Sequence, residues 1–268
     1  MERLAQGKRK ISSAEVVRKN MNEKLKSYKE KILLLTKDCD VNTKWRVSSL
    51  LEAMQTVSGN HCELLGAGKA ELDAMGVTWV LARSEIEMKR WPSYGEKITV
   101  ETIPLANRHF MFPRVFFLYD ESGEKIGAAN TAWSLFDISN RSVVTKVDHI
   151  AAILPDNSDL NINAVIPPQI RNLDGEKTSV KYEPMYSDLD FNGHVNNTKY
   201  ADFLCNTLGI DLMKKYEFSK LAFNYKTEVL PGQKLTFNLY RKENDFLLIG
   251  ETNEYEAFRI GGSLKKRG

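Results

Sequence analysis

One order of signals occurs twice along this chain, and it constrains the fold more than any other feature. Residues 38–44 (DCDVNTK) and 188–194 (DLDFNGH) share a pattern of acids and an amide. In each copy an amphipathic stretch at helical spacing follows, and several strand-like runs come after it. A chain of 268 residues is long enough for two such units, each with a core of its own. The sequence therefore predicts a duplicated fold.

The first unit is predicted to hold one helix and five strands. Apolar residues recur at helical spacing between Val47 and Val57, so a helix is expected near Thr43–Val57. The segment Asp120–Gly123 has the composition of a hairpin turn between the last two strands. The expected strands are Lys31–Leu35, Thr78–Met88, Lys97–Ile103, Met111–Tyr119 and Ile126–Phe136.

The second unit repeats this order, with a helix expected near Val195–Leu208. Residues 95–100 (GEKITV) and 232–237 (GQKLTF) match at the same place in the two units, which supports duplication. One helix followed by antiparallel strands, twice over, predicts an α+β fold in which each sheet curls around its own helix. The expected strands are Ser179–Met185, Leu221–Val229, Lys234–Tyr240, Phe246–Glu251 and Tyr255–Ile260.

Charge and composition divide the chain into four parts. We expect a flexible extension at 1–30, a first domain at 31–147, a linker at 148–177 rich in Asp, Asn and Pro, and a second domain at 178–262. The basic pI comes from the start of the chain, where residues 1–31 hold ten Lys/Arg against four Glu. Lys8–Lys10 is better explained as a solvated charge cluster than as a nucleic-acid contact, because no aromatic residues interleave it.

Several classes of protein do not fit the composition. An apolar run long enough to span a membrane is missing, and the chain does not open on a secretory signal pattern. The cysteines and histidines lack metal-ligand spacing, and no glycine-rich phosphate cradle is present. We therefore expect a cytoplasmic protein without cofactor or metal. The three scattered cysteines that favour a reducing compartment are Cys39, Cys62 and Cys205.

The residues best suited to chemistry are Asp190, Asn192 and His194. In an extended segment their i, i+2, i+4 spacing would point the three side chains the same way. A neutral histidine accepts a proton, an amide orients a water or a carbonyl, and a carboxylate fixes the imidazole tautomer. A helix starting near Val195–Asn197 would add free N–H groups for an oxyanion. Because Lys44 stands at the position of His194 in the first copy, the chemistry is expected in the second unit alone.

Capping explains part of the same segment. Aspartate and asparagine before a helix are common N-cap and Asx-turn residues, and for Asp188 that explanation is the better one. For Asp190 and Asn192 both explanations stay open, and His194 favours chemistry because a cap does not require a histidine. Glu228 could activate a water. On a strand at Leu221–Val229, however, alternation places it on the polar side, so the residues alone make it a weak candidate.

A family resemblance adds to this picture. Residues 187–200 (SDLDFNGHVNNTKY) and 223–228 (FNYKTE) resemble the acyl-acyl carrier protein thioesterases of bacteria and plants, and so do residues 76–83 (GVTWVLAR) and 132–137 (AWSLFD). The resemblance covers about Lys31–Ile260. It implies two tandem hotdog domains forming a pseudo-dimer, each a long helix wrapped by an antiparallel sheet.

The resemblance also implies an activity. The family hydrolyses the thioester between a fatty acyl chain and the phosphopantetheine of acyl carrier protein, with catalytic residues that fall on Asp190, Asn192, His194 and Glu228. Val229 stands where plant members carry a cysteine, so no thiol-acyl intermediate is expected there and water attack is implied. The first domain is expected to lodge the acyl chain. An acyl-CoA hydrolase and a non-catalytic acyl-binding protein are the alternatives, and association into a homodimer stays open.

Overall fold

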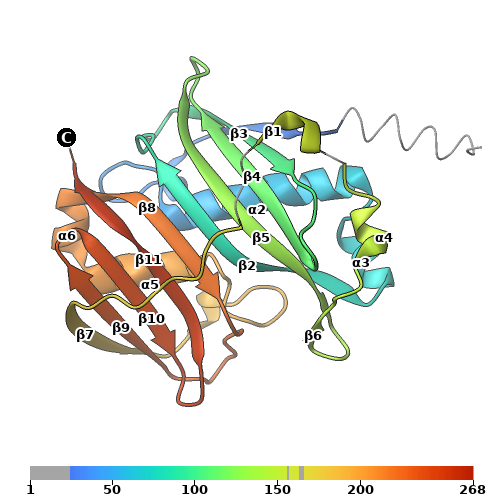
Figure 1. Ribbon diagram of the computed structural model, residues 1–268. Helices are drawn as coiled ribbons and strands as arrows, with labels where there is room; N and C mark the ends of the chain where they lie inside the picture. Colours follow the sequence, from blue (N-terminus) through green and yellow to red (C-terminus); the bar gives the residue numbers. More distant parts are fainter. Residues whose placement is uncertain (1–24, 156, 163–165, 268) are drawn as a thin grey trace, which may run out of the picture.

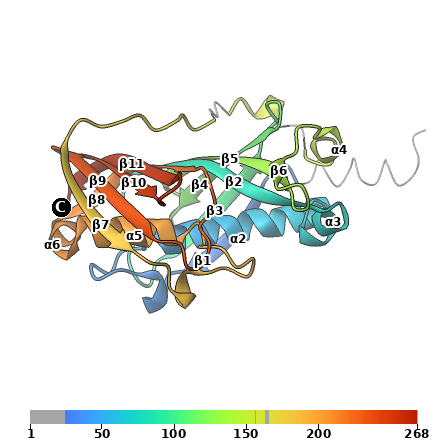
Figure 2. The same ribbon diagram turned by 90° about the horizontal axis from the view of Figure 1, so that it is seen from below.

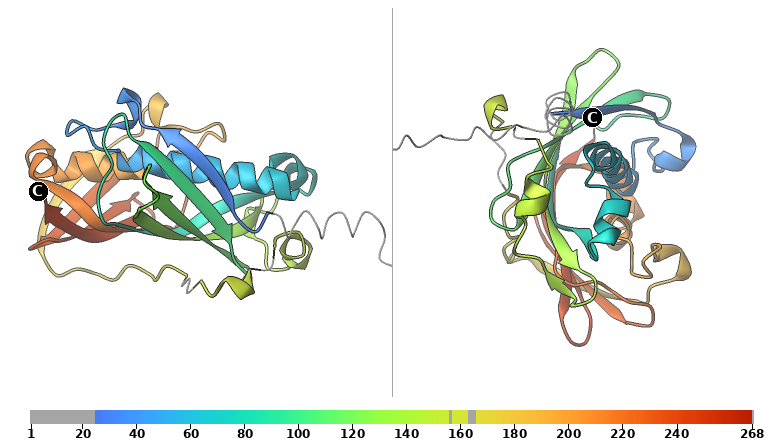
Figure 3. Two further views of the ribbon diagram at one scale, coloured as in Figure 1. Left: turned by 90° about the horizontal axis from the view of Figure 1, so that it is seen from above. Right: turned by 90° about the vertical axis from the view of Figure 1, so that its right-hand side faces the viewer.

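The computed structural model describes residues 25–155, 157–162 and 166–267. Its strands form one curved antiparallel sheet, and the two long helices lie end to end against the concave face (Figures 1 and 3). The strand order across this sheet is β1-β3-β4-β5-β2-β8-β11-β10-β9-β7, with β6 paired to β5. Within the described residues, no helix is long and apolar enough to cross a membrane.

The first half contains the longer helix, α2 (Val47–Leu65), and two short helices, α3 (Lys69–Ala74) and α4 (Asp148–Ala151). Single 3-10 turns occur at Thr36–Asp38 and Ser158–Leu160. The strands of this half are β1 (Tyr28–Leu33), β2 (Val77–Met88), β3 (Lys97–Pro104), β4 (Met111–Tyr119), β5 (Lys125–Asp137) and β6 (Ser142–Val143).

The second half has the same order of elements. It contains α5 (Lys199–Leu208) and α6 (Ile210–Lys215), with a 3-10 turn at Tyr186–Asp188 before α5. Its strands are β7 (Glu176–Tyr182), β8 (Tyr216–Tyr225), β9 (Leu235–Lys242), β10 (Asp245–Glu251) and β11 (Glu256–Lys266).

The two halves meet along β2 and β8 in a symmetric register. Glu85 pairs with Ala222 at the centre, Ser84 pairs with Phe223, and Ile86 pairs with Leu221. Each residue of β2 therefore corresponds to the residue of β8 that lies 137 positions later in the sequence. This correspondence relates Ser84 to Leu221 and Ile86 to Phe223, so it converts one of the two pairs beside the centre into the other. The predicted duplication and the tandem hotdog fold are confirmed, with the halves paired as a pseudo-dimer in one continuous sheet.

The core lies between the helices and the concave face of the sheet. One cluster of buried side chains runs through both halves and includes Leu50 and Met54 of α2, Leu204 of α5, and Phe223 of β8. Full burial of side chains of this size stabilises a fold by roughly 1.5–3 kcal/mol each. The apolar spacing read from the sequence therefore points at the core, as a 3.6-residue period requires.

Both long helices begin later than predicted, and α2 is also longer. The turns before them extend to Arg46 and Thr198, so α2 begins at Val47 and α5 at Lys199. Helix α2 runs on to Leu65, past the predicted end at Val57, because buried side chains continue along it. It ends at Gly66, whose left-handed φ of 75° suits a residue without a Cβ.

Strand β8 ends at Tyr225, four residues before the predicted end at Val229. The amides of Lys226 and Thr227 both donate to the carbonyl of Ala257, at 2.9 and 3.1 Å, so the chain leaves the ladder there. At the other end of the chain β11 extends to Lys266, past the predicted strand end at Ile260 and the domain end at 262. Strand β1 begins at Tyr28, three residues before the predicted start at Lys31.

The segment joining the halves crosses the convex face of the sheet, away from the helices (Figure 2). The side chain of Asn224 accepts from the amide of Ile170 at 2.8 Å, and Arg83 donates to the carbonyl of Pro167 at 3.1 Å. These contacts tie the segment to β8 and β2. The predicted domain limits remain predictions. Most of the predicted extension at 1–30 lies outside the described residues, which begin at 25, and Lys8–Lys10 falls there too.

Candidate active site

The segment 188–194 is a tight turn rather than an extended strand. The Asp190 carboxylate accepts from the amides of Asn192 and His194 at 2.8 and 3.3 Å, and the Asp190 amide donates to the carbonyl of His194 at 2.8 Å. Gly193 provides the left-handed φ of 80° that this turn needs. The predicted alignment of three side chains by strand alternation is therefore wrong, and Asp190 acts as an Asx-turn residue.

The first copy makes the same bonds. Asp40 accepts from the amides of Asn42 and Lys44 at 2.8 and 3.1 Å, and its own amide donates to the carbonyl of Lys44 at 2.8 Å. The two turns differ in the residue that follows the asparagine, where Thr43 adopts a φ of 60° in place of glycine. The aspartates of the repeated pattern are thus explained by the turn in both copies, whereas the side chains of Asn192 and His194 are not.

Glu228 lies beside His194, although strand alternation had placed it on the polar side. Glu228 lies in the loop after β8. In the same loop, the carbonyl of the buried Val229 accepts a hydrogen bond of 2.9 Å from the backbone amide of Val195. This bond fixes the loop against the turn. Glu228 Oε2 then lies 3.1 Å from His194 Nε2. The alternation argument was wrong because β8 ends three residues before Glu228.

A residue of the first half completes this arrangement. Arg141, in the turn between β5 and β6, forms an ion pair through Nη2 with Glu228 Oε1. One carboxylate oxygen therefore faces a guanidinium and the other an imidazole. The side chains of Arg141, His194 and Glu228 are 61, 29 and 27% exposed, so the cluster is open to solvent. Sequence analysis missed Arg141, because no local pattern links a turn of one half to a loop of the other.

Asn192 and the start of α5 differ from expectation. The side chain of Asn192 is exposed and makes no hydrogen bond to the described part of the chain. The amides of Val195 and Asn196 already donate to the carbonyls of Val229 and Asp188, at 2.9 and 2.8 Å, so they are not free for an oxyanion. The side chain of Asn197 accepts from that of Gln55 in α2 at 2.5 Å, which joins α2 to the segment before α5.

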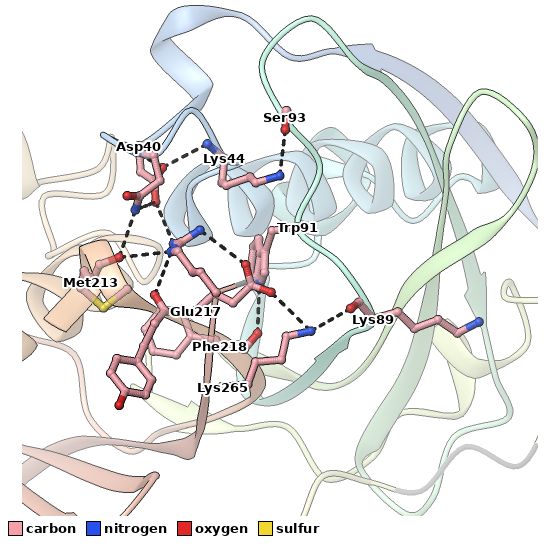
Figure 4. A network of polar contacts seen from close by, with 12 residues as sticks. Asp40, Lys44, Lys89, Trp91, Ser93, Met213, Glu217, Phe218 and Lys265 are labelled. Atoms are coloured by element: carbon pink, nitrogen blue, oxygen red, sulfur yellow. Dashed lines mark hydrogen bonds and ion pairs between the residues drawn. The ribbon is translucent and has the colours of Figure 1, made fainter.

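The matching place in the first half is occupied by different residues (Figure 4). Trp45 donates its amide to the carbonyl of Pro92 at 2.8 Å, as Val195 does to Val229, so Trp91 corresponds to Glu228 and Lys44 to His194. Trp91 is 3% exposed and donates its indole N–H to the carbonyl of Phe218 at 2.7 Å. Lys44 reaches Ser93 Oγ at 2.9 Å. A buried indole thus replaces the carboxylate.

The second half also closes this matching place. The side-chain amide of Asn42 donates to the carbonyl of Met213 in α6 at 3.0 Å, and the guanidinium of Arg267, after β11, lies 3.6 Å from the Asp40 carboxylate. The same asparagine is therefore engaged in the first copy and exposed in the second. Of the two ends of the pseudo-dimer, only the one around His194 combines an open surface with an acid, a base and a free amide.

Other reactive groups do not add to the site. Burial raises the pKa of the Cys205 thiol to about 12, and the charge of Asp202 adds to this rise. A thiol of that kind is a poor nucleophile at neutral pH. Among residues 25–155, 157–162 and 166–267, no group of three or more His, Cys, Asp or Glu side chains is placed to hold a metal ion.

Comparison with models of known protein families gives two matches that together span most of the chain. The acyl-ACP thioesterase N-terminal domain matches residues 25–154, and the acyl-ACP thioesterase C-terminal domain matches residues 171–256. The chloroplastic oleoyl-acyl carrier protein thioesterase of Coriandrum sativum is 24% identical over 238 residues, which are 82% of this chain and 64% of the relative. The chain thus spans about three-fifths of the length of the curated relatives it matches.

Solved structures share the fold over nearly the whole chain. An acyl-ACP thioesterase from Bacteroides thetaiotaomicron superposes with a TM-score of 0.81 at 24% identity, covering 91% of this chain and 99% of its own. The 12:0-ACP thioesterase from Umbellularia californica superposes with a TM-score of 0.78 at 18% identity, covering 90% of this chain and 98% of its own. These likenesses show the fold, and the matches to both of its domains show that the chain belongs to the acyl-ACP thioesterase family.

Proposed function

We propose that this protein hydrolyses the thioester between a fatty acyl chain and the phosphopantetheine of acyl carrier protein, releasing the free fatty acid. The observation that carries the proposal is the contact of 3.1 Å between His194 and Glu228, held beside an exposed asparagine. Family membership supports the same reaction. Non-catalytic binding of an acyl chain would need an apolar interior and would not need this pair.

In the proposed reaction Glu228 takes a proton from water, and the water oxygen attacks the thioester carbonyl carbon. The tetrahedral intermediate then expels the phosphopantetheine sulfur, which receives a proton through His194, so the products are a carboxylic acid and a thiol. Arg141 favours the charged form of Glu228, because an adjacent cation stabilises a carboxylate. Asp190 holds the turn that carries His194, and it makes no hydrogen bond to the imidazole among the described residues.

The exposed amide of Asn192 is the group we assign to the thioester carbonyl or the attacking water. It takes that role in place of the backbone amides of Val195 and Asn196, which lie before α5 and are already bonded. A single polarising donor of this kind typically contributes a factor of about 10²–10³ in rate. The mechanism forms no bond to a cysteine, in keeping with Val229 next to Glu228 and with the raised pKa of Cys205.

We infer that the acyl chain enters the first half, between α2 and its sheet, as the resemblance implies. Two cations of that half lie at the site: Arg141 pairs with Glu228, and the Lys69 ammonium lies 5.8 Å from the ring of Phe191 in the turn. Each of these cations is already paired with an acid, Arg141 with Glu228 and Lys69 with Asp73 at 2.7 Å, so docking of an acidic carrier protein through Lys or Arg stays a prediction. A cytoplasmic location is proposed as well, supported by free Cys39, Cys62 and Cys205. A homodimer stays a prediction.

The test compares acyl carrier protein thioesters with acyl-CoA thioesters of the same chain lengths, using the full chain and measuring thiol release. We expect a higher kcat/KM for the carrier-protein thioester, with a preference that weakens as salt is added, because docking between opposite charges is screened. Equal values without salt dependence would favour an acyl-CoA hydrolase. If neither thioester is hydrolysed but acyl chains still bind, the protein is a binding module.

A further inference from the structure

Glu228 lies outside the strand ladder, so its place beside His194 depends on what holds the loop that carries it. Residues 226–233 form this loop and lie between β8 and β9. The carbonyl of Glu228 accepts a hydrogen bond of 3.2 Å from the hydroxyl of Tyr255, and no second donor to this carbonyl is found within the described residues. Tyr255 therefore contacts the backbone of the residue that we propose as the base.

The same hydroxyl also reaches the turn that closes the loop. Gln233 Oε1 lies 3.0 Å from the Tyr255 hydroxyl and accepts from the amide of Leu230 at 2.9 Å. Because a tyrosine hydroxyl carries one hydrogen, that hydrogen lies between two acceptors, the Gln233 side chain and the Glu228 carbonyl. The ring of Tyr255 packs against the core, in the turn between β10 and β11. One hydroxyl thus ties the loop to this hairpin.

The first half holds its copy of the loop with ion pairs. Residues 89–96 match residues 226–233, because the two segments lie 137 positions apart, as β2 and β8 do. Arg90 pairs with Glu96 of this loop at 2.8 Å, and with Asp120 of the hairpin between β4 and β5 at 2.9 Å. A single charged side chain therefore ties loop to hairpin in the first half.

The second half keeps this link without its charges. Asp120 and Thr252 match, because each is the first residue after the first strand of its hairpin. All three charged residues are replaced by neutral ones, which are Thr227, Gln233 and Thr252. Because position 227 adjoins Glu228, an arginine there would bring a second guanidinium close to a carboxylate that already faces one. The Tyr255 hydroxyl makes the same connection as a neutral group.

We propose that Tyr255 is a positioning residue of the site. Its hydroxyl, shared between the Glu228 carbonyl and Gln233, fixes the loop of residues 226–233. The Glu228 carboxylate is thereby kept at 3.1 Å from His194, where it can take a proton from water. Displacing a reacting group by about 1 Å can lower a rate by about 10². Tyr255 acts through Glu228 and not on the thioester, so this inference rests on the proposed thioesterase function.

The test is a double-mutant cycle with Tyr255→Phe and Glu228→Gln, in which kcat and KM are measured for an acyl carrier protein thioester. Tyr255→Phe keeps the packed ring and removes only the hydroxyl. In the wild-type background we expect kcat to fall by roughly 10-fold with little change in KM, because the base is displaced while the substrate binds as before. In the Glu228→Gln background the same substitution should change kcat by less than about 2-fold, since the group it positions is already lost.

Tyr119→Phe is the matched control. It removes a partly buried tyrosine hydroxyl that donates to Glu101 Oε2, also at 3.2 Å, at the end of β4 in the first half. The two variants should therefore lose similar stability in a thermal melt, and Tyr119→Phe should keep the wild-type kcat. A loss of kcat common to both would indicate a general effect of stability and would overturn the assignment.

The remaining outcomes separate this inference from the proposed function. If Tyr255→Phe keeps the wild-type kcat, or lowers it equally in both backgrounds, Tyr255 does not act through Glu228, so the assignment is wrong and the thioesterase function stands. If Glu228→Gln alone leaves kcat unchanged, Glu228 is not the base, and the positioning role fails while hydrolysis itself stands. If the wild type hydrolyses no thioester, the proposed function fails and the positioning role fails with it.

Discussion

Glu228→Gln is the substitution that tests the proposed chemistry most directly. It keeps the shape of a side chain whose two oxygens face Arg141 and His194, and it removes the charge that accepts a proton from water. Loss of a general base typically lowers the rate by about 10²–10⁴, which corresponds to roughly 3–5 kcal/mol of barrier. Because the carboxylate makes its contacts without bonding the acyl chain, KM should change little.

The same variant should fold normally. The side chains of Arg141 and Glu228 are 61 and 27% exposed, and ion pairs with this much exposure contribute at most about 1 kcal/mol. For a chain of this size that corresponds to a fall in Tm of less than about 4 °C. A thermal melt of Glu228→Gln beside the wild type separates lost chemistry from lost stability.

The deciding assay combines steady-state hydrolysis with mass spectrometry of enzyme quenched during turnover. We expect a low kcat for Glu228→Gln and no acyl adduct on any cysteine of the wild type. Near-normal activity of the variant, together with an adduct of acyl mass on Cys39, Cys62 or Cys205, would refute water attack through Glu228. Hydrolysis in ¹⁸O water does not decide the question, since direct attack and an acyl-enzyme both label the product acid.

Three further predictions test the asymmetry and the charges. His194→Ala should lower kcat by about 10²–10⁴ while Lys44→Ala leaves it nearly unchanged, and similar losses in both would contradict a single site. Arg141→Ala should lower kcat/KM, because it removes the cation that pairs with the Glu228 carboxylate, and an unchanged kcat/KM would exclude a role for this ion pair. Burial and the nearby charge of Arg114 lower the pKa of His61 to about 4. In the unfolded chain the His61 imidazole takes up a proton below about pH 6.5, whereas in the folded protein it does so only near pH 4. The free energy of unfolding measured in urea should therefore fall as the pH is lowered from 6.5 to 4, and it should fall less in His61→Gln.

Local signals predicted the elements that depend on local physics. Strand β4 has the predicted bounds Met111–Tyr119, and the turn at Asp120–Gly123 closes with the Gly123 amide donating to the Asp120 carbonyl at 3.0 Å. Alternation and turn composition suffice there, since both act between neighbours in the chain. The start of α5 was predicted four residues early, because the turn uses Val195 and Asn196 to bond Val229 and Asp188.

The candidate site could be predicted only in part for a related reason. His194 differs from its counterpart Lys44, so comparison of the two copies found it. Glu228 was misplaced by alternation, because the end of β8 depends on a carbonyl of β11, Ala257, that no local pattern reveals. Arg141 comes from the opposite half, and its approach to Glu228 requires the pairing of β2 with β8. Resemblance to a family singled out Glu228 where alternation did not, since a family pattern carries information about such distant contacts, and the catalytic role of Glu228 stays a prediction.

The two ends of the pseudo-dimer differ in what each half contributes to the other, and this difference supports the proposed restriction of chemistry to one end. At the first end, α6 and Arg267 of the second half close over Asp40 and Asn42, and Trp91 fills the space of the carboxylate. At the second end, the first half contributes Arg141, which lies beside Glu228 without covering Asn192. Restoring His at position 44 alone would therefore add a base without a partner carboxylate, because the buried indole of Trp91 occupies the place that corresponds to Glu228.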